Sequence, residues 1–298
     1  MKQLSLFVLG GLMLVLTGCG PAESSKTEPK TPTAPVTRDT SEVFQSAKSI
    51  FYSLPSPMEL STLIKSAGGE FRKDLLHDPN KANTYQSTQK RALALGLYGA
   101  DLSYSSVYNM TGDAVKFLAA SKRLGETIGI QEAFSANLIE RANINLGNRD
   151  SMFSIMTEMY WQTNSQLKEE NRDQLALIVM AGGWAEGLYM GCNAISSDDP
   201  QPQIEQRMAE QMFASKQMEE MFNFYDDDPM VADVHALFQP TFDLFNSLTI
   251  VEVERTISED EATGKHTIGG ESQISFGPDD MEKLTLVANE LRSKIVEP

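Results

Sequence analysis

The stretch from Asp173 to Ile195 restricts the fold more than any other part of this chain. Between Leu175 and Cys192 it carries one charged side chain, Glu186, and is otherwise almost entirely apolar or small. A helix that is apolar on nearly every side must be buried on nearly every side. We therefore expect this stretch to be the central helix of an all-helical domain. A membrane-spanning helix is the alternative, which the four glycines, the Glu and the lack of a basic flank disfavour.

Small residues recur along this expected helix at four-residue intervals, at Gly183, Gly187 and Gly191. Such a stripe lets the backbone of a neighbouring helix approach closely, at a cost in helix propensity that packing must offset. We therefore expect a close helix contact along this stripe, and we expect leucine in place of Gly187 to be strongly destabilising.

The remaining pattern is that of an all-α helical bundle of about eight to ten helices. Helical spacing of apolar residues runs almost without interruption from residue 41 to residue 248. Residues 249–277 differ, because they alternate and are rich in β-branched side chains, which favours a small β-hairpin or an irregular flap. A final amphipathic helix is expected over 279–296. Residues 41–298 would then form a single helical domain.

Two segments of this domain resemble each other, which suggests an internal duplication. Ala120–Glu126 matches Ala214–Glu220 at most positions, and Ala100–Tyr104 resembles Ala185–Tyr189. These matches predict two pseudo-repeats of a long helix, a loop and a second helix, over about 85–130 and 172–225. Two similar helical compositions matching by chance are the alternative.

The first residues follow the pattern of a secretory signal peptide, with a basic start, an apolar run and small residues before a cut. As a helix, the apolar run from Leu4 to Leu16 would span only ~20 Å of a bilayer core of ~30 Å. We therefore interpret 1–18 as a cleaved leader rather than a membrane anchor.

The end of this leader, Leu16-Thr17-Gly18-Cys19, resembles the lipobox of bacterial lipoproteins. The resemblance implies that Cys19 becomes the first residue of the mature protein and carries a covalent diacylglycerol and an N-acyl lipid. It also implies the outer membrane of a Gram-negative bacterium, because Gly20 stands where enteric lipoproteins retained in the inner membrane have Asp. The helical domain is similar to helical lipoproteins rather than to an enzyme family.

Residues 19–40 read as a flexible tether between this lipid and the domain, because they are rich in proline and polar residues and cannot bury much apolar surface. Removal of residues 1–18 takes away one Lys and no acid, so 24 basic and 41 acidic residues remain and the formal charge becomes −17. This charge argues against binding to nucleic acid. The lipid on Cys19 makes the membrane the expected partner, and the sequence identifies no protein partner or small ligand.

Motifs of catalysis and metal binding are missing from the sequence. It holds no nucleophile elbow, zinc-protease motif, phosphate-binding loop or dinucleotide fingerprint, and its three histidines are scattered. We therefore predict no catalytic residue, no metal site and no cofactor other than the lipid on Cys19. The second cysteine, Cys192, is expected to be a small buried residue, with a free reactive thiol as the alternative.

A repeated pair of carboxylate and tyrosine is the main candidate site. Asp101 and Tyr104, like Glu186 and Tyr189, are three residues apart and share a helix face. Both acids lie in apolar helices, where a charge must be paired. They indicate either a buried polar cluster joining two helices, or a ligand pocket with both acids at its floor.

That pocket would be rimmed by Tyr98, Tyr108 and Trp184 and would suit a cation, a polyol or a metal. Two functions follow from these alternatives. The first is a non-catalytic binding or scaffolding role at the cell envelope. The second is a ligand-dependent or metal-dependent envelope enzyme that uses a buried Asp101/Glu186 site.

Overall fold

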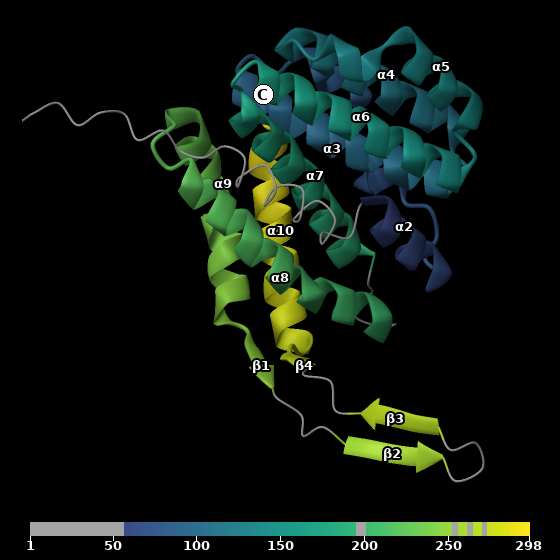
Figure 1. Ribbon diagram of the computed structural model, residues 1–298, viewed down its shortest axis with the longest axis vertical. Coiled ribbons are helices and arrows are strands. Elements are labelled where there is room, and N and C mark those ends of the chain that lie inside the picture. Colours follow the sequence, from purple (N-terminus) through teal and green to yellow (C-terminus); the bar gives the residue numbers. More distant parts are fainter. Residues whose placement is uncertain (1–56, 195–200, 252–255, 261–264, 270–272) are drawn as a thin grey trace, which may run out of the picture. The chain divides into compact units, whose positions relative to one another are not determined.

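The computed structural model describes residues 57–194, 201–251, 256–260, 265–269 and 273–298. Cys19, the lipobox, the expected tether and the helix expected from residue 41 lie outside these residues. Within them the chain is an all-α bundle with a small antiparallel β element near its C-terminus, which confirms the expected fold class (Figure 1).

The α-helices of the described residues are α2 (Pro57–Ser66), α3 (Thr88–Val107), α4 (Thr111–Ile128), α5 (Ala136–Asn145), α6 (Arg149–Glu169), α7 (Asp173–Asn193), α8 (Pro202–Phe224), α9 (Pro229–Ser247) and α10 (Pro278–Val296). Short 3₁₀ helices are η1 (Lys73–Leu75), η2 (Pro79–Asn83) and η3 (Gln131–Phe134). The strands are β1 (Thr249–Val251), β2 (Thr256–Asp260), β3 (Lys265–Gly269) and β4 (Gln273–Ser275).

Local signals in the sequence account for several helix ends. Ser87 caps α3 by accepting a hydrogen bond from the Lys90 N–H, which has no partner within the helix. Gly129 ends α4 at a φ of +84°, a conformation that glycine adopts without strain. Asp228 caps α9, and Pro229 follows it at the first helical position, where its missing N–H costs nothing.

Helix α7 is central, as the sequence predicts, but it shares that place with α3. In α7, 16 of 21 residues are buried, and in α3, 15 of 20 are buried. The two helices pack against each other more extensively than any other pair in the described chain. Helix α7 is long and apolar enough to cross a membrane, yet 89% of its most apolar window is buried inside the protein. This burial favours a core helix.

The tightest approach of α3 and α7 lies at Gly96 and Gly182. Of the three glycines that the sequence singled out, only Gly183 takes part in it, since a Cβ atom there would lie 3.3 Å from the Gly96 carbonyl oxygen. A Cβ atom at Gly96 would lie 1.9 Å from the Val179 carbonyl oxygen, and one at Gly182 would lie 2.1 Å from the Leu93 oxygen. A Cβ atom at Gly187 would meet only the Leu60 side chain, at an ordinary 3.7 Å. The expectation that Gly187 forms a close helix contact is therefore wrong.

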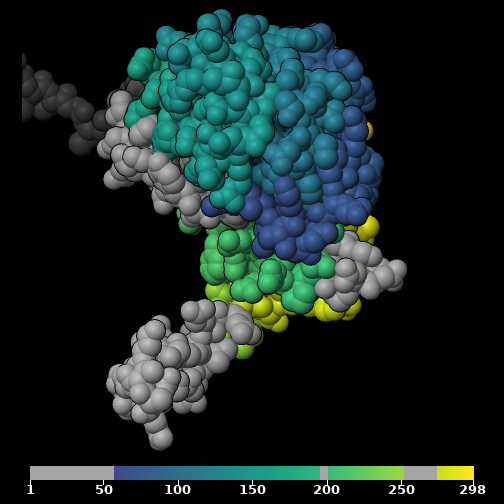
Figure 2. All heavy atoms as spheres, turned by 90° about the vertical axis from the view of Figure 1, so that its right-hand side faces the viewer, coloured from purple at the N-terminus to yellow at the C-terminus, as the bar shows by residue number. Residues whose placement is uncertain are grey.

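The other helices pack around this pair. Helix α2 contacts α3, α7 and α8, and lies at the surface between the blue-to-teal helices and the green ones (Figure 2). Helix α10 packs on α7 and α9, and α8 packs on α9. The proposed duplication stays a prediction. Both proposed copies contain two successive helices, but α3 packs closely on α4 whereas α7 has fewer contacts with α8.

The β element over residues 249–277 consists of two short antiparallel ladders. Strand β1 pairs with β4, with Thr249 opposite Ser275. Strand β2 pairs with β3, with Thr256 opposite Gly269. The expectation of a small β element over these residues is confirmed, and β2–β3 is the longer of the two ladders.

Candidate functional site

The structure brings both predicted acids together in the interior. Asp101 comes from α3 and Glu186 from α7, neither is exposed to solvent, and their carboxyl groups lie close enough for each to shift the pKa of the other. The two acids meet because α3 and α7 pack against each other more extensively than any other pair of helices in the described chain. Asp101 also accepts a hydrogen bond from the His77 N–H, at 3.2 Å.

Arg292 of α10 provides the positive charge of this cluster. Its Nε and Nη2 atoms donate to the two Glu186 carboxylate oxygens at 3.2 and 3.3 Å, and Nη2 also donates to the Leu75 carbonyl oxygen. The guanidinium lies over the Tyr189 ring, 4.6 Å from its centre. A two-pronged bond to a carboxylate combined with an aromatic face suits arginine rather than lysine.

The charges of the cluster balance if the two acids hold one proton. Burial is the main cause that raises the pKa of Asp101 well above its ordinary value, and the neighbouring Glu186 raises it further. Burial also raises the pKa of Glu186, to about 6, against the opposing pull of Arg292. Both pKa values are raised, and Arg292 bonds Glu186 directly, so a proton that the pair retains resides on Asp101 while Glu186 is the charged partner of Arg292.

The hydrogen bonds of Asp101 agree with this assignment. Its Oδ1 atom is buried and meets no hydrogen-bond donor in the part of the chain that the structure describes. A proton on Oδ1 would make that atom a donor, for which the neighbouring Glu186 carboxylate is the candidate acceptor. Leaving it unsatisfied would cost ~1–3 kcal/mol. Asp101, Glu186 and Arg292 then form one neutral, fully bonded group.

His77 and Tyr85 extend the polar cluster on the side of Asp101. The His77 ring lies 2.8 Å from the Tyr85 hydroxyl through Nε2 and stacks on Tyr98, which donates to the Asp78 carbonyl oxygen. Burial, followed by repulsion from Arg292, lowers the pKa of His77 to about 4. The imidazole is therefore neutral at physiological pH and acts as a hydrogen-bonding group.

The other predicted residues are divided between this cluster and distant positions. Tyr189 belongs to the cluster through its ring. Tyr104 does not: its hydroxyl donates to the Glu70 carbonyl oxygen and accepts from the Arg72 N–H. Tyr108 donates to the Gly69 carbonyl oxygen instead of rimming a pocket over the acids. The predicted aromatic rim above the two carboxylates therefore does not form.

Sequence reasoning missed Arg292 and His77. Arg292 could have been found, because it lies on the same face of the last helix as its buried residues Met281, Leu284, Ala288, Leu291 and Ile295. A basic residue on an apolar face needs an acidic partner in the interior. His77 gave no comparable signal, since its part of the chain has no regular pattern.

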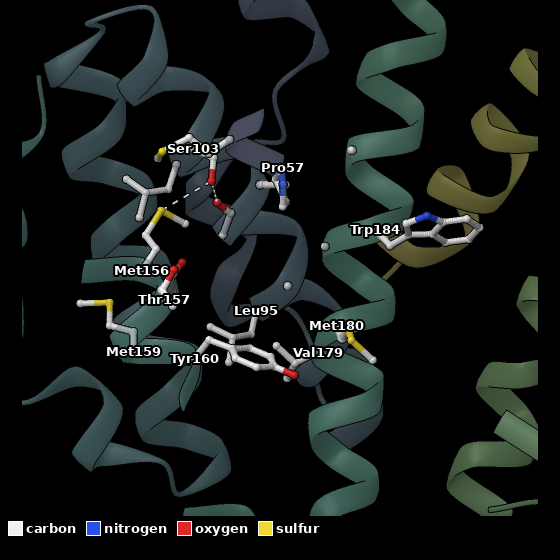
Figure 3. A pocket seen from close by; sticks show the side chains of 18 of the residues that line it. Pro57, Leu95, Ser103, Met156, Thr157, Met159, Tyr160, Val179, Met180 and Trp184 are labelled. Carbon is white, nitrogen blue, oxygen red and sulfur yellow. Dashed lines mark hydrogen bonds between the residues drawn. The ribbon is translucent and has the colours of Figure 1, made fainter. Parts of the chain in front are cut away.

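A cavity of about 300 Å³ lies on the other side of α3 and α7. Its wall is mostly apolar and comes chiefly from α3, α6 and α7, and it includes Leu95, Met156, Met159, Tyr160, Val179 and Met180. Figure 3 shows Tyr160 of α6 opposite Val179 and Met180 of α7. A volume of this size is at the lower end of the range for small-molecule sites, ~300–1,000 Å³.

The cavity and the polar cluster use different faces of the same two helices. On α3 the cavity is lined by Leu95, Gly99 and Leu102, whereas Tyr98 and Asp101 point to the cluster. At 3.6 residues per turn these two sets fall on separate sides of the helix. Neither Asp101 nor Glu186 is among the described residues that line the cavity.

Comparison of the chain with protein families, with curated proteins and with solved structures found no match.

The chemistry of the two places therefore has to be judged from their geometry. A neutral acid beside a carboxylate can transfer a proton, but a substrate would have to reach it, and both acids here are wholly buried. In the described chain no group of three or more His, Cys, Asp or Glu side chains could hold a metal ion. The cavity, by contrast, offers an apolar surface that a ligand can contact.

Cys192 is buried in α7, and burial raises the pKa of its thiol to about 12. At neutral pH the thiol stays protonated and is a poor nucleophile. The geometry therefore favours the interpretation of Cys192 as a small packing residue.

Proposed function

We propose that this protein is a lipid-anchored component of the bacterial cell envelope whose helical domain binds an apolar ligand without catalysing a reaction. The single observation that carries the binding role is the apolar cavity between α6 and the α3–α7 pair. The lipid anchor rests on the lipobox at Cys19, and the outer membrane on Gly20 after it.

The packing around the cavity supports this proposal. Interiors of proteins are close-packed, and an unfilled apolar space forfeits contacts that would stabilise the fold. Methionine side chains in the wall adapt readily to the shape of a ligand, and Met156, Met159 and Met180 all lie there. A binding site gives a reason for this open space, whereas a purely structural bundle gains nothing from it.

The enzyme alternative receives less support from the polar cluster. Arg292 and the proton shared with Asp101 already satisfy Glu186, and a group that is fully paired and buried is suited to holding helices together. The Asp101/Glu186 site is therefore assigned to the frame of the domain in this proposal, and the cavity to its function.

A substitution at Gly99 offers a direct test of the binding role. It lines the cavity, and a Cβ atom there would have no neighbour within 4 Å. We expect Gly99→Leu to fill the cavity without a clash and to raise helix propensity by about 1 kcal/mol. Gly112→Leu is a matched control, because Gly112 has similar open space but does not line the cavity.

The measurement is photolabelling of the full chain in membranes of the producing cells with a hexadecane that carries a diazirine, followed by mapping of the labelled peptides by mass spectrometry. In the wild type and in Gly112→Leu, the label should concentrate on α3, α6 and α7. In Gly99→Leu this labelling should fall by about tenfold while the melting temperature does not fall. Equal labelling of Gly99→Leu and the control would refute the binding role.

A further inference from the structure

The wall of the cavity contains one polar group that needs a partner. Ser121 of α4 lines the cavity and is 4% exposed. Its hydroxyl has no hydrogen-bond partner among the residues that the structure describes. Buried side-chain hydroxyls in proteins are almost always hydrogen-bonded, so an unpartnered one in the wall of a cavity points to a polar atom of a ligand.

Two other polar groups of the wall have partners inside the protein. The Ser103 hydroxyl donates to the Gly99 carbonyl oxygen and also contacts the Met156 sulfur, the interaction drawn in Figure 3. The Trp184 N–H donates to Gln211. Among the described residues of the wall, Ser121 has the one fully buried side-chain polar atom without a partner, so a polar atom that enters the cavity would be best complemented there.

The charges in the wall restrict the ligand further. The described residues that line the cavity include one carboxylate, Glu59, and no Lys, Arg or His. An anionic head group would be buried there without a counter-charge, which is strongly unfavourable. The small volume of about 300 Å³ suits one hydrocarbon chain rather than the paired chains of a membrane phospholipid.

We propose that the cavity takes the single chain of a neutral amphiphile, and that a hydroxyl or carbonyl oxygen of this molecule forms a hydrogen bond with the Ser121 hydroxyl. Long-chain alcohols and monoesters have this chemistry, whereas ionised fatty acids do not. The proposal rests on the proposed function, since it names the ligand class of the same cavity.

The test compares three photoreactive probes on the full chain in membranes of the producing cells: hexadecanol, hexadecanoate and hexadecane, each with the same diazirine. Of the three probes, hexadecanol should give the strongest labelling of α3, α4 and α6. Ser121→Ala should lower hexadecanol labelling by roughly twofold to tenfold, the value of one neutral hydrogen bond. It should leave hexadecane labelling unchanged, which also shows that the variant is folded and its cavity intact.

Ser103→Ala is the matched control, because its hydroxyl is already bonded to the backbone. Ser103→Ala should leave the labelling by each of the three probes as it is in the wild type. Unchanged hexadecanol labelling in Ser121→Ala would overturn the role of Ser121, and equal labelling by hexadecanoate would overturn the neutral head group. In both cases loss of labelling in Gly99→Leu would leave the binding role standing. Failure of Gly99→Leu to reduce labelling by any probe would instead refute the binding role itself.

Discussion

The proton shared by Asp101 and Glu186 predicts that two similar substitutions have very different costs. Asp101→Asn replaces a neutral acid by a neutral amide. Its Nδ2 can donate to Glu186 as the acid does, and its carbonyl oxygen can accept from the His77 N–H. Glu186→Gln instead removes the charge that two hydrogen bonds from Arg292 balance.

The magnitudes follow from the burial of each group. Loss of one partner of a buried ion pair costs ~3–5 kcal/mol. The Arg292 side chain is 16% exposed to solvent, and in Glu186→Gln it would keep its hydrogen bond to the Leu75 carbonyl oxygen and its contact with the Tyr189 ring. The lower end, about 3 kcal/mol, therefore applies to Glu186→Gln. Asp101→Asn should cost less than about 1 kcal/mol or stabilise the fold, since no hydrogen bond is lost and the amide takes up no proton on folding.

Urea denaturation of the full chain at neutral pH measures both costs, and thermal melting provides a second reading. At about 2–4 °C per kcal/mol, Glu186→Gln should lower the melting temperature by about 6–12 °C. Glu282→Gln, an exposed acid on α10, is the control and should change little. Adding Arg292→Met to Glu186→Gln should cost less than the sum of the two single changes, because contacting charges couple. A larger cost for Asp101→Asn than for Glu186→Gln would refute the assignment of the proton.

Three further predictions follow. The raised pKa of Asp101 means that the folded state retains a proton that the unfolded chain releases at about pH 3.9. The contribution of this proton to stability is complete below that pH and is lost as the pH rises toward the pKa of the folded state. In urea titrations from about pH 5 to about pH 8 the wild type should therefore lose more free energy of unfolding than Asp101→Asn, and equal losses would contradict the raised pKa. Gly182→Ala should destabilise by ~1–3 kcal/mol or more because its Cβ meets backbone, whereas Gly187→Ala should be neutral or stabilising; thermal melting ranks the two, and the reverse order would remove the close α3–α7 approach. Cys19→Ala should block acylation, and fatty-acid labelling that marks this variant as strongly as the wild type would exclude the lipid anchor.

The central helix could be predicted from the sequence because composition alone restricts it. A helix with one charge among so many apolar residues has to be buried, and α7 is. The meeting of Asp101 and Glu186 could also be anticipated, since each acid lies in an apolar helix and needs a partner. Their weak sequence repeat then indicated that the partner of each was the other helix.

The identity of the closest helix contact could not be predicted in the same way. Gly183, Gly187 and Gly191 form a regular stripe, but close approach depends on where α3 crosses α7, and a single sequence does not fix that crossing point. The crossing lies at Gly96 and Gly182, where carbonyl groups of the facing helix occupy the space of a Cβ atom. The cavity was missed for a related reason, because it depends on how far α6 lies from the α3–α7 pair.

The arrangement of the two faces of α3 and α7 explains how an open cavity is compatible with a stable fold. The neutral cluster of Asp101, Glu186 and Arg292 joins α3, α7 and α10 on one side. The glycine contact closes the crossing of α3 and α7, where Gly96 and Gly183 also line the cavity. These interactions hold the two helices in place through close backbone contact and a buried ion pair rather than through the larger side chains of the cavity wall. The larger side chains that line the cavity are therefore free of that task and can be selected for a ligand. A binding site between α6 and a frame that is fixed elsewhere can change its lining, as at Ser121, with little effect on the rest of the domain.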